Sequence, residues 1–143
     1  MAHRSAVRFL FVSGFYPPHD IGGYEKHCRE VAEGLGERGH DVHVLTSRHG
    51  VSRLVQDGSV RRALFLESSL QHYSPLHFFV GRRHEERHNI LELQSTLAQT
   101  APDAIVFWGM WNLSRRLPAV AERSGVPVAY WLEDLWPIEP DMH

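Results

Sequence analysis

Short apolar runs with strand composition alternate along this chain with longer segments of helical spacing. The runs 7–13, 41–46, 103–108 and 126–132 are rich in valine, leucine and aromatic residues. Apolar runs of about four to eight residues are typical of strands that are buried on both faces. Alternation of strands with helices favours right-handed crossovers and a largely parallel sheet that is covered on both faces. The prediction is therefore an α/β fold of the doubly wound, Rossmann-like type.

Three segments have the apolar spacing of amphipathic helices: 24–38, 81–100 and 114–124. Gly39 stands where the first helix is expected to reach a left-handed C-cap. Pro118 lies inside the third segment, so that helix is predicted to begin late or to kink there.

Residues 51–56 and 60–66 flank the dipeptide Asp57-Gly58. This dipeptide is typical of two-residue hairpin turns, because both residues tolerate the left-handed backbone that such turns require. The mostly parallel sheet is therefore predicted to carry a β-hairpin insertion. Residues 67–80 show no clear period and are interpreted as a loop.

Length and composition limit the chain to one ordinary domain. It has 143 residues, of which 43% are hydrophobic and 22% are charged, and its formal net charge is −2. This near-neutral balance gives no support for nucleic-acid binding, which usually requires a concentrated basic face. The single cysteine, Cys28, excludes an internal disulfide and fits a reducing compartment.

The sequence also bears on location and completeness. No apolar run approaches the roughly 20 residues that span a bilayer, and residues 1–8 are too polar for a signal peptide. The expected location is cytoplasmic, and peripheral membrane contact stays open because it needs only a local patch. The chain ends just past a predicted strand without a closing helix, which predicts that it is truncated.

Three predicted loops, 14–23, 109–113 and 133–137, lie at the carboxyl edge of the sheet. Ligands of open parallel sheets bind beyond the carboxyl ends of the strands, where the strand order reverses. Residue types suited to binding or catalysis gather in these loops: Tyr16, His19, Asp20, Gly22, Gly23, Trp111, Asn112, Glu133, Asp134 and Trp136. We therefore expect the site at this edge.

Gly22-Gly23 directly precedes the first predicted helix. Backbone N–H groups at a helix start attract phosphate, and the missing side chains allow close approach. A tight strand-to-helix turn is the alternative explanation for the two glycines. The G-x-G-x-x-G fingerprint of dinucleotide-binding enzymes does not occur, which disfavours an NAD enzyme.

Residues 84–88, His-Glu-Glu-Arg-His, match the H-E-x-x-H pattern of zinc peptidases. In that pattern two histidines on one helical face bind zinc, and the glutamate is the general base. Here Glu86 and Arg87 replace apolar residues, no third ligand follows at a recognisable spacing, and chance pairs are common among 11 histidines. The segment is interpreted as a solvated face with i,i+4 charge pairs, so no metal site is predicted.

Most aromatic residues near the strand ends are expected to lie in the core, since strands such as 126–132 are predicted to be buried. Trp111 and Trp136 follow strands instead. Each is a candidate to stack on a sugar or a lipid acceptor, with simple packing as the alternative.

The stretch 15–47 resembles the opening of family 4 glycosyltransferases, which are retaining enzymes with the GT-B fold. The matching motifs are Tyr16-Pro17-Pro18, Gly22-Gly23, Glu25, Arg38-Gly39-His40 and the strand 41–46. Residues 102–109 and 126–137 look like later strand segments of the same domain. The resemblance thus covers nearly the whole chain.

This resemblance implies half of a GT-B fold. Residues 1–143 would be the N-terminal, acceptor-side domain, and the C-terminal domain that holds the donor would be absent, leaving this chain inactive alone. The enzyme would transfer a sugar from a nucleotide-sugar to a sugar or lipid-linked acceptor with retention. The nucleotide-sugar is then a substrate, and no cofactor or metal is required, because amides and basic residues stabilise the leaving phosphate.

The resemblance also implies positions for the site residues. Gly22 and Gly23 would approach the donor phosphates. The acceptor or cleft residues would be Tyr16, His19, Glu25, Trp108, Trp111, Asn112 and Glu133.

The chain departs from its relatives at two of these positions. Trp108 stands where many relatives carry a histidine near the reacting sugar, and Glu133 replaces the histidine of a His-Asp pair. Asp134, which is retained, is the candidate catalytic residue. It would orient an acceptor hydroxyl or take its proton, with capping of a following helix as the alternative.

Two further functions stay open beside sugar transfer. One is a non-catalytic Rossmann-like domain that binds a ligand or a partner. The other is a different GT-B enzyme, such as a nucleotide-sugar epimerase or a phosphorylase.

Overall fold

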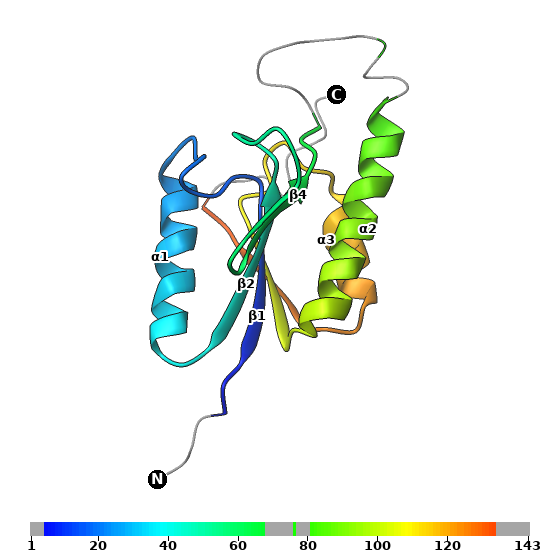
Figure 1. Ribbon diagram of the computed structural model, residues 1–143. Coiled ribbons are helices and arrows are strands. Elements are labelled where there is room, and N and C mark those ends of the chain that lie inside the picture. Colours follow the sequence, from blue (N-terminus) through cyan, green and yellow to red (C-terminus); the bar gives the residue numbers. More distant parts are fainter. Residues whose placement is uncertain (1–4, 68–75, 77–80, 134–143) are drawn as a thin grey trace.

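The computed structural model describes residues 5–67, 76 and 81–133 and shows an α/β domain built on one twisted sheet (Figure 1). The elements are β1 (Arg8–Ser13), α1 (Gly23–Glu37), β2 (Asp41–Ser47), β3 (Val55–Asp57), β4 (Val60–Leu64), α2 (Arg82–Thr100), β5 (Ala104–Trp108), α3 (Arg116–Arg123) and β6 (Val128–Trp131). The sheet order is β3-β4-β2-β1-β5-β6, and only the β3–β4 pair is antiparallel. The predicted α/β class is confirmed.

Helices cover both faces of the sheet. In Figure 1, α1 lies on one side, and α2 and α3 lie side by side on the other. Alternate residues of β1 point to the two sides: Leu10 and Val12 pack in the cluster beneath α2 and α3, and Phe11 packs with Cys28 and Trp108 beneath α1. This alternation is what a strand buried on both faces requires.

The helix boundaries follow local chemistry. α1 gives way to Gly39, whose φ of +89° is the left-handed conformation predicted for it. α3 begins late, at Arg116, so Pro118 falls in its first turn. Proline is tolerated there because the N–H groups of a first turn have no partner within the helix.

The predicted hairpin exists, but its turn was placed one residue too early. Asp57 pairs with Val60, so the two loop residues are Gly58 and Ser59. Gly58 has a φ of +56° and takes the left-handed position alone. Moreover, β4 pairs in parallel with β2 and is an integral strand of the sheet, which leaves only β3 outside the parallel pattern.

The prediction that strand 126–132 is buried was wrong. β6 is the last strand of the sheet, and Tyr130 and Trp131 are 37% and 40% exposed. An apolar run identifies a strand but does not say whether the strand is central or at an edge. In the part of the chain that the structure describes, no helix is long and apolar enough to cross a membrane.

Candidate functional site

The carboxyl ends of β1 and β5 meet at the centre of the sheet. β1 lies between β2 and β5, which is where the chain changes direction across the sheet. Gly14 donates its N–H to the carbonyl of Gly109 at 3.1 Å. A Cβ on Gly14 would lie 3.0 Å from the carbonyl oxygen of Trp111 and 3.2 Å from that of Gly109, so a larger residue would push these backbones apart. The loop after β1 and the loop after β5 are therefore in direct contact.

Gly22 and Gly23 form the start of α1, beside this junction. Gly22 has φ −167° and ψ −169°, an extended backbone that any residue adopts. A Cβ would meet only Glu25 Oε2, at 3.7 Å, on Gly22 and nothing within 4 Å on Gly23. Both glycines are exposed. Neither backbone strain nor packing within the described chain therefore explains why both positions are glycine.

Glu25 lies inward rather than in an open cleft. Its side chain is 9% exposed, and Oε2 accepts a hydrogen bond from the N–H of Gly22 at 2.9 Å. This is the reaching-back contact of an N3 glutamate at a helix start. Glu25 thus fixes the glycine loop and contributes negative charge to the first turn, where the helix dipole favours it.

Tyr16 is also turned inward. Its ring is 6% exposed, and burial is the main cause that raises its pKa to about 12. Arg62 of β4 holds the backbone around it: Nη1 donates to Tyr16 O at 2.9 Å and Nη2 donates to Pro17 O at 2.6 Å. The backbone of the Tyr-Pro-Pro loop is therefore hydrogen-bonded to the guanidinium of a buried arginine.

His19 lies over the loop that follows β2. Gly50 has a φ of +83°, and a Cβ there would come within 2.3 Å of Cγ and Nδ1 of His19. The position therefore requires glycine both for its backbone and for the ring above it.

This double requirement predicts the effect of Gly50→Ala. Alanine in the left-handed region costs about 1–3 kcal/mol, and displacing His19 adds to that. Gly39→Ala is the matched control, because Gly39 has a φ of +89° and nothing within 4 Å of its Cβ position. In urea unfolding we expect Gly50→Ala to lose more free energy than Gly39→Ala. Equal losses would show that His19 moves aside without cost.

Trp111 provides the exposed aromatic surface of the site. It is 53% exposed and stacks on Phe15 with ring centroids 6.0 Å apart and an interplanar angle of 27°. Phe15 also packs against His49, with ring centroids 5.0 Å apart in an edge-to-face arrangement. Asn112 follows with a φ of +64°, and its carbonyl accepts the N–H of Glu67 at 2.8 Å. One face of the Trp111 indole thus packs on the Phe15 ring.

Trp108 lies in the core beneath this edge. It is 1% exposed, stacks between Phe11 and Trp131, and donates its indole N–H to Tyr24 O at 3.1 Å. Glu133 follows β6 and is partly exposed, with its carboxylate near His27 of α1. Asp134 and Trp136 lie outside the described residues.

Comparison with known proteins agrees with this architecture. The family model of Glycosyltransferase Family 4 matches residues 21–141. The chain belongs to glycosyltransferase family 4. The Uncharacterized glycosyltransferase MJ1607 of Methanocaldococcus jannaschii is similar, with 28% identity over 85 residues. That stretch covers 59% of this chain but only 22% of the relative.

The H-E-x-x-H segment of this family 4 domain has a structural explanation. His88 Nε2 contacts the carbonyl of Ala63 at 3.0 Å, and its ring meets Phe65 edge-on at 4.9 Å. His84 is exposed. Among residues 5–67, 76 and 81–133, no group of three or more His, Cys, Asp or Glu is placed to hold a metal ion.

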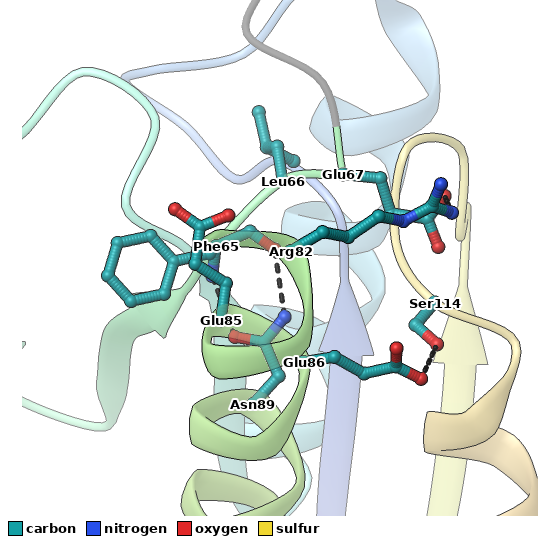
Figure 2. A pocket seen from close by; sticks show the side chains of 8 residues that line it. All are labelled: Phe65, Leu66, Glu67, Arg82, Glu85, Glu86, Asn89 and Ser114. Atoms are coloured by element: carbon teal, nitrogen blue, oxygen red, sulfur yellow. Dashed lines mark hydrogen bonds and ion pairs between the residues drawn. The ribbon is translucent and has the colours of Figure 1, made fainter. Parts of the chain in front are cut away.

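A small polar pocket lies where the start of α2 meets the segment after β4 (Figure 2). Two of its carboxylates are engaged, Glu67 with Arg82 at 3.0 Å and Glu86 with the hydroxyl of Ser114 at 3.1 Å. Asn89 makes two 2.8 Å hydrogen bonds with the backbone of Phe65. These contacts join α2 to the segments that follow β4 and β5.

Arg62, Tyr24 and His27 contribute to the geometry of this candidate site, and the sequence analysis missed them. Arg62 lies in a strand that was interpreted as part of a hairpin, and its partners Tyr16 and Pro17 are far away in sequence. Tyr24 and His27 look like ordinary positions of an amphipathic helix. The adjacent pair Arg-Arg within the strand 60–64 was the one available signal, since a charged residue buried in a central strand needs a specific partner.

Proposed function

We propose that this family 4 domain is the acceptor-side half of a retaining GT-B glycosyltransferase that uses a nucleotide-sugar donor. Membership of the family supports sugar transfer. The proposal that the donor binds at the start of α1 rests on the exposed Gly22-Gly23 loop. Neither glycine has an explanation within the described fold.

In this proposal the donor diphosphate lies against the start of α1. The positive end of the helix dipole and the backbone N–H groups of the first turn favour a phosphate at that place, beside the Gly22 N–H that Glu25 already binds. Because no side chain projects from Gly23, phosphate oxygens can reach the backbone directly. Fixed N–H donors would also stabilise the negative charge that grows on the leaving diphosphate during sugar transfer. This mechanism requires no metal.

The acceptor would lie across the edge, near the loop after β5. The exposed face of Trp111, held by Phe15, suits stacking on a sugar ring. His19 and Asn112 border the same loops as candidate polar contacts. Asp134 follows Glu133 directly and is proposed to orient the acceptor hydroxyl or take its proton.

The second half of the cleft would come from a C-terminal domain. The match to the archaeal relative covers 22% of that protein, which supports a longer enzyme around this domain. Residues 1–143 alone are then expected to bind the donor weakly and to transfer no sugar. Submicromolar binding of a nucleotide-sugar by residues 1–143, measured by calorimetry, would contradict this.

Peripheral membrane contact is a further part of the proposal. Arg83 and Arg87 lie on the exposed face of α2 beside Leu91, which is 57% exposed. Such a combination favours an anionic lipid surface. Sedimentation with anionic and with neutral vesicles tests this, and equal recovery with both would contradict it.

The full-length protein tests the catalytic proposal. It is incubated with a panel of nucleotide-sugars and with sugar or lipid-linked acceptors, and the anomeric configuration of the product is determined by NMR. Retained configuration in a glycoside product is the expected result. Release of a free epimerised sugar would favour a nucleotide-sugar epimerase, and the absence of any turnover would favour a binding domain.

A further inference from the structure

Two indole rings from neighbouring strands stack at the edge of the sheet. Trp108 of β5 and Trp131 of β6 have ring centroids 4.4 Å apart and an interplanar angle of 3°. His27 of α1 stands edge-on against both, 5.4 Å from each, with interplanar angles of 90° and 88°. The histidine therefore packs edge-to-face against both indole rings, an arrangement that aromatic pairs favour.

Glu133 completes this arrangement from the segment after β6. Its Oε1 lies 2.7 Å from His27 Nδ1 and accepts the indole N–H of Trp131 at 2.8 Å. Burial acts to raise the pKa of the Glu133 carboxyl, but the hydrogen bonds from Trp131 and His27 outweigh it, and the pKa is lowered. The carboxylate is thus an ionised acceptor for two side chains.

Tyr24 also connects α1 to the end of β6, through backbone atoms of Trp131 and Glu133. Its hydroxyl donates to Trp131 O at 2.8 Å and accepts the N–H of Glu133 at 3.0 Å. Its ring lies against Gly109, where a Cβ would come within 3.0 Å of it. The first turn of α1 is therefore bonded to the ends of both β5 and β6.

We propose that Glu133 is a positioning residue that ties the N-terminal part of α1, through His27, to the end of β6. This inference rests on the proposed function, because the two parts that it joins are the donor loop and the catalytic segment. α1 begins with the Gly22-Gly23 loop, and Glu133 directly precedes Asp134. The tie fixes the separation between the donor loop and the carboxyl end of β6, which the proposed catalytic residue follows in sequence. Errors of about 1 Å in such a separation can slow a reaction about 100-fold.

The experiment compares Glu133→Ala with Glu133→Gln in the full-length protein. Tyr24 binds only backbone atoms of this segment, so both variants keep its contacts. Glutamine also keeps an oxygen that can accept from Trp131 and His27, whereas alanine removes it. We expect kcat/KM for the nucleotide-sugar to fall at least tenfold in Glu133→Ala and to stay within about threefold in Glu133→Gln. A residue that transfers a proton would behave differently, since both variants would lose about 100- to 10,000-fold in kcat.

A spectroscopic readout is independent of activity. In ¹⁵N-labelled protein, Glu133→Ala is expected to move the Trp131 indole N–H resonance upfield and to accelerate its hydrogen exchange. Glu30→Ala is the control, because Glu30 is exposed on the same helix. It should change neither the resonance nor kcat/KM.

The outcomes separate this inference from the proposed function. If the wild-type protein transfers sugar and Glu133→Ala has the wild-type resonance and kcat/KM, the positioning role is wrong. If Glu133→Gln is as damaged as Glu133→Ala in kcat, the carboxylate acts chemically and the role is again wrong. If the wild-type protein transfers no sugar, the proposed function fails first, whatever the Trp131 resonance shows.

Discussion

Replacing Gly23 with valine in the full-length protein is expected to lower kcat/KM for the nucleotide-sugar about 100-fold without lowering the melting temperature. The added methyl groups would project from the start of α1 into the place proposed for the donor diphosphate. Displacing the donor by about 1 Å is enough for an effect of this size. Gly23→Ala should give a smaller loss in the same direction.

The unchanged stability is the informative half of this prediction. A Cβ on Gly23 meets nothing within 4 Å, so the side chain has room in the described domain. Glycine is also a poor helix former, costing about 1 kcal/mol relative to alanine. Gly23→Ala should therefore leave the free energy of unfolding equal or slightly raised, while activity falls. A substitution that raises the free energy of unfolding but lowers kcat/KM would indicate that glycine is needed here for ligand binding rather than for stability.

Gly34→Ala is the matched control for this experiment. Gly34 lies in the same helix, and its Cβ position also meets nothing within 4 Å. It is far along α1 from the loop, so Gly34→Ala should gain stability and keep full activity. If Gly23→Val retains kcat/KM within about threefold of the wild type, the donor does not approach this loop, and the proposal for Gly22 and Gly23 is wrong.

The fold could be predicted from the sequence because its signals are local. A central strand that is buried on both faces consists of consecutive apolar residues, and an amphipathic helix repeats its apolar residues over several turns. The place of β6 at the sheet edge could not be predicted, since its run of apolar residues resembles that of β5. Pairing between strands decides exposure, and pairing depends on residues far apart in sequence.

The candidate site divides in the same way. Gly22-Gly23 and Trp111 could be proposed from the sequence, because the glycines directly precede a predicted helix and the tryptophan follows a predicted strand. Tyr24 and His27 were missed because their importance comes from partners more than a hundred residues away, at Trp131 and Glu133. The apolar spacing of the helix does not depend on those partners, so it gives no indication of them.

Arg62→Met is expected to lower the free energy of unfolding by about 2 kcal/mol. Arg62 is 4% exposed, and its guanidinium supplies two hydrogen bonds to the Tyr-Pro-Pro backbone. Losing bonds to a charged donor costs about 1.5–3 kcal/mol each. Removing a buried charge offsets part of this loss, and burial is indeed the largest cause that lowers the pKa of Arg62. The hydrogen bonds should outweigh that relief.

The backbone geometry indicates which carbonyl is affected most. Tyr16 O also accepts the N–H of His19 at 3.2 Å, so it keeps a partner in the variant. Pro17 O depends on Arg62 Nη2 among the contacts that the described residues show. Lysine keeps the buried charge but cannot donate to both carbonyls from one planar group. Arg62→Lys is therefore expected to recover less than half of the lost free energy.

Urea unfolding of the three proteins, followed by tryptophan fluorescence, measures these differences. Arg53→Met is the control, since Arg53 is exposed, and its effect should stay within about 0.5 kcal/mol. If Arg62→Lys has the free energy of unfolding of the wild type, the loop needs a positive charge nearby rather than the two hydrogen bonds from one guanidinium. Wild-type stability in Arg62→Met would mean that the Tyr-Pro-Pro loop holds its shape without β4, and the donor loop that follows it would then be positioned by α1 alone.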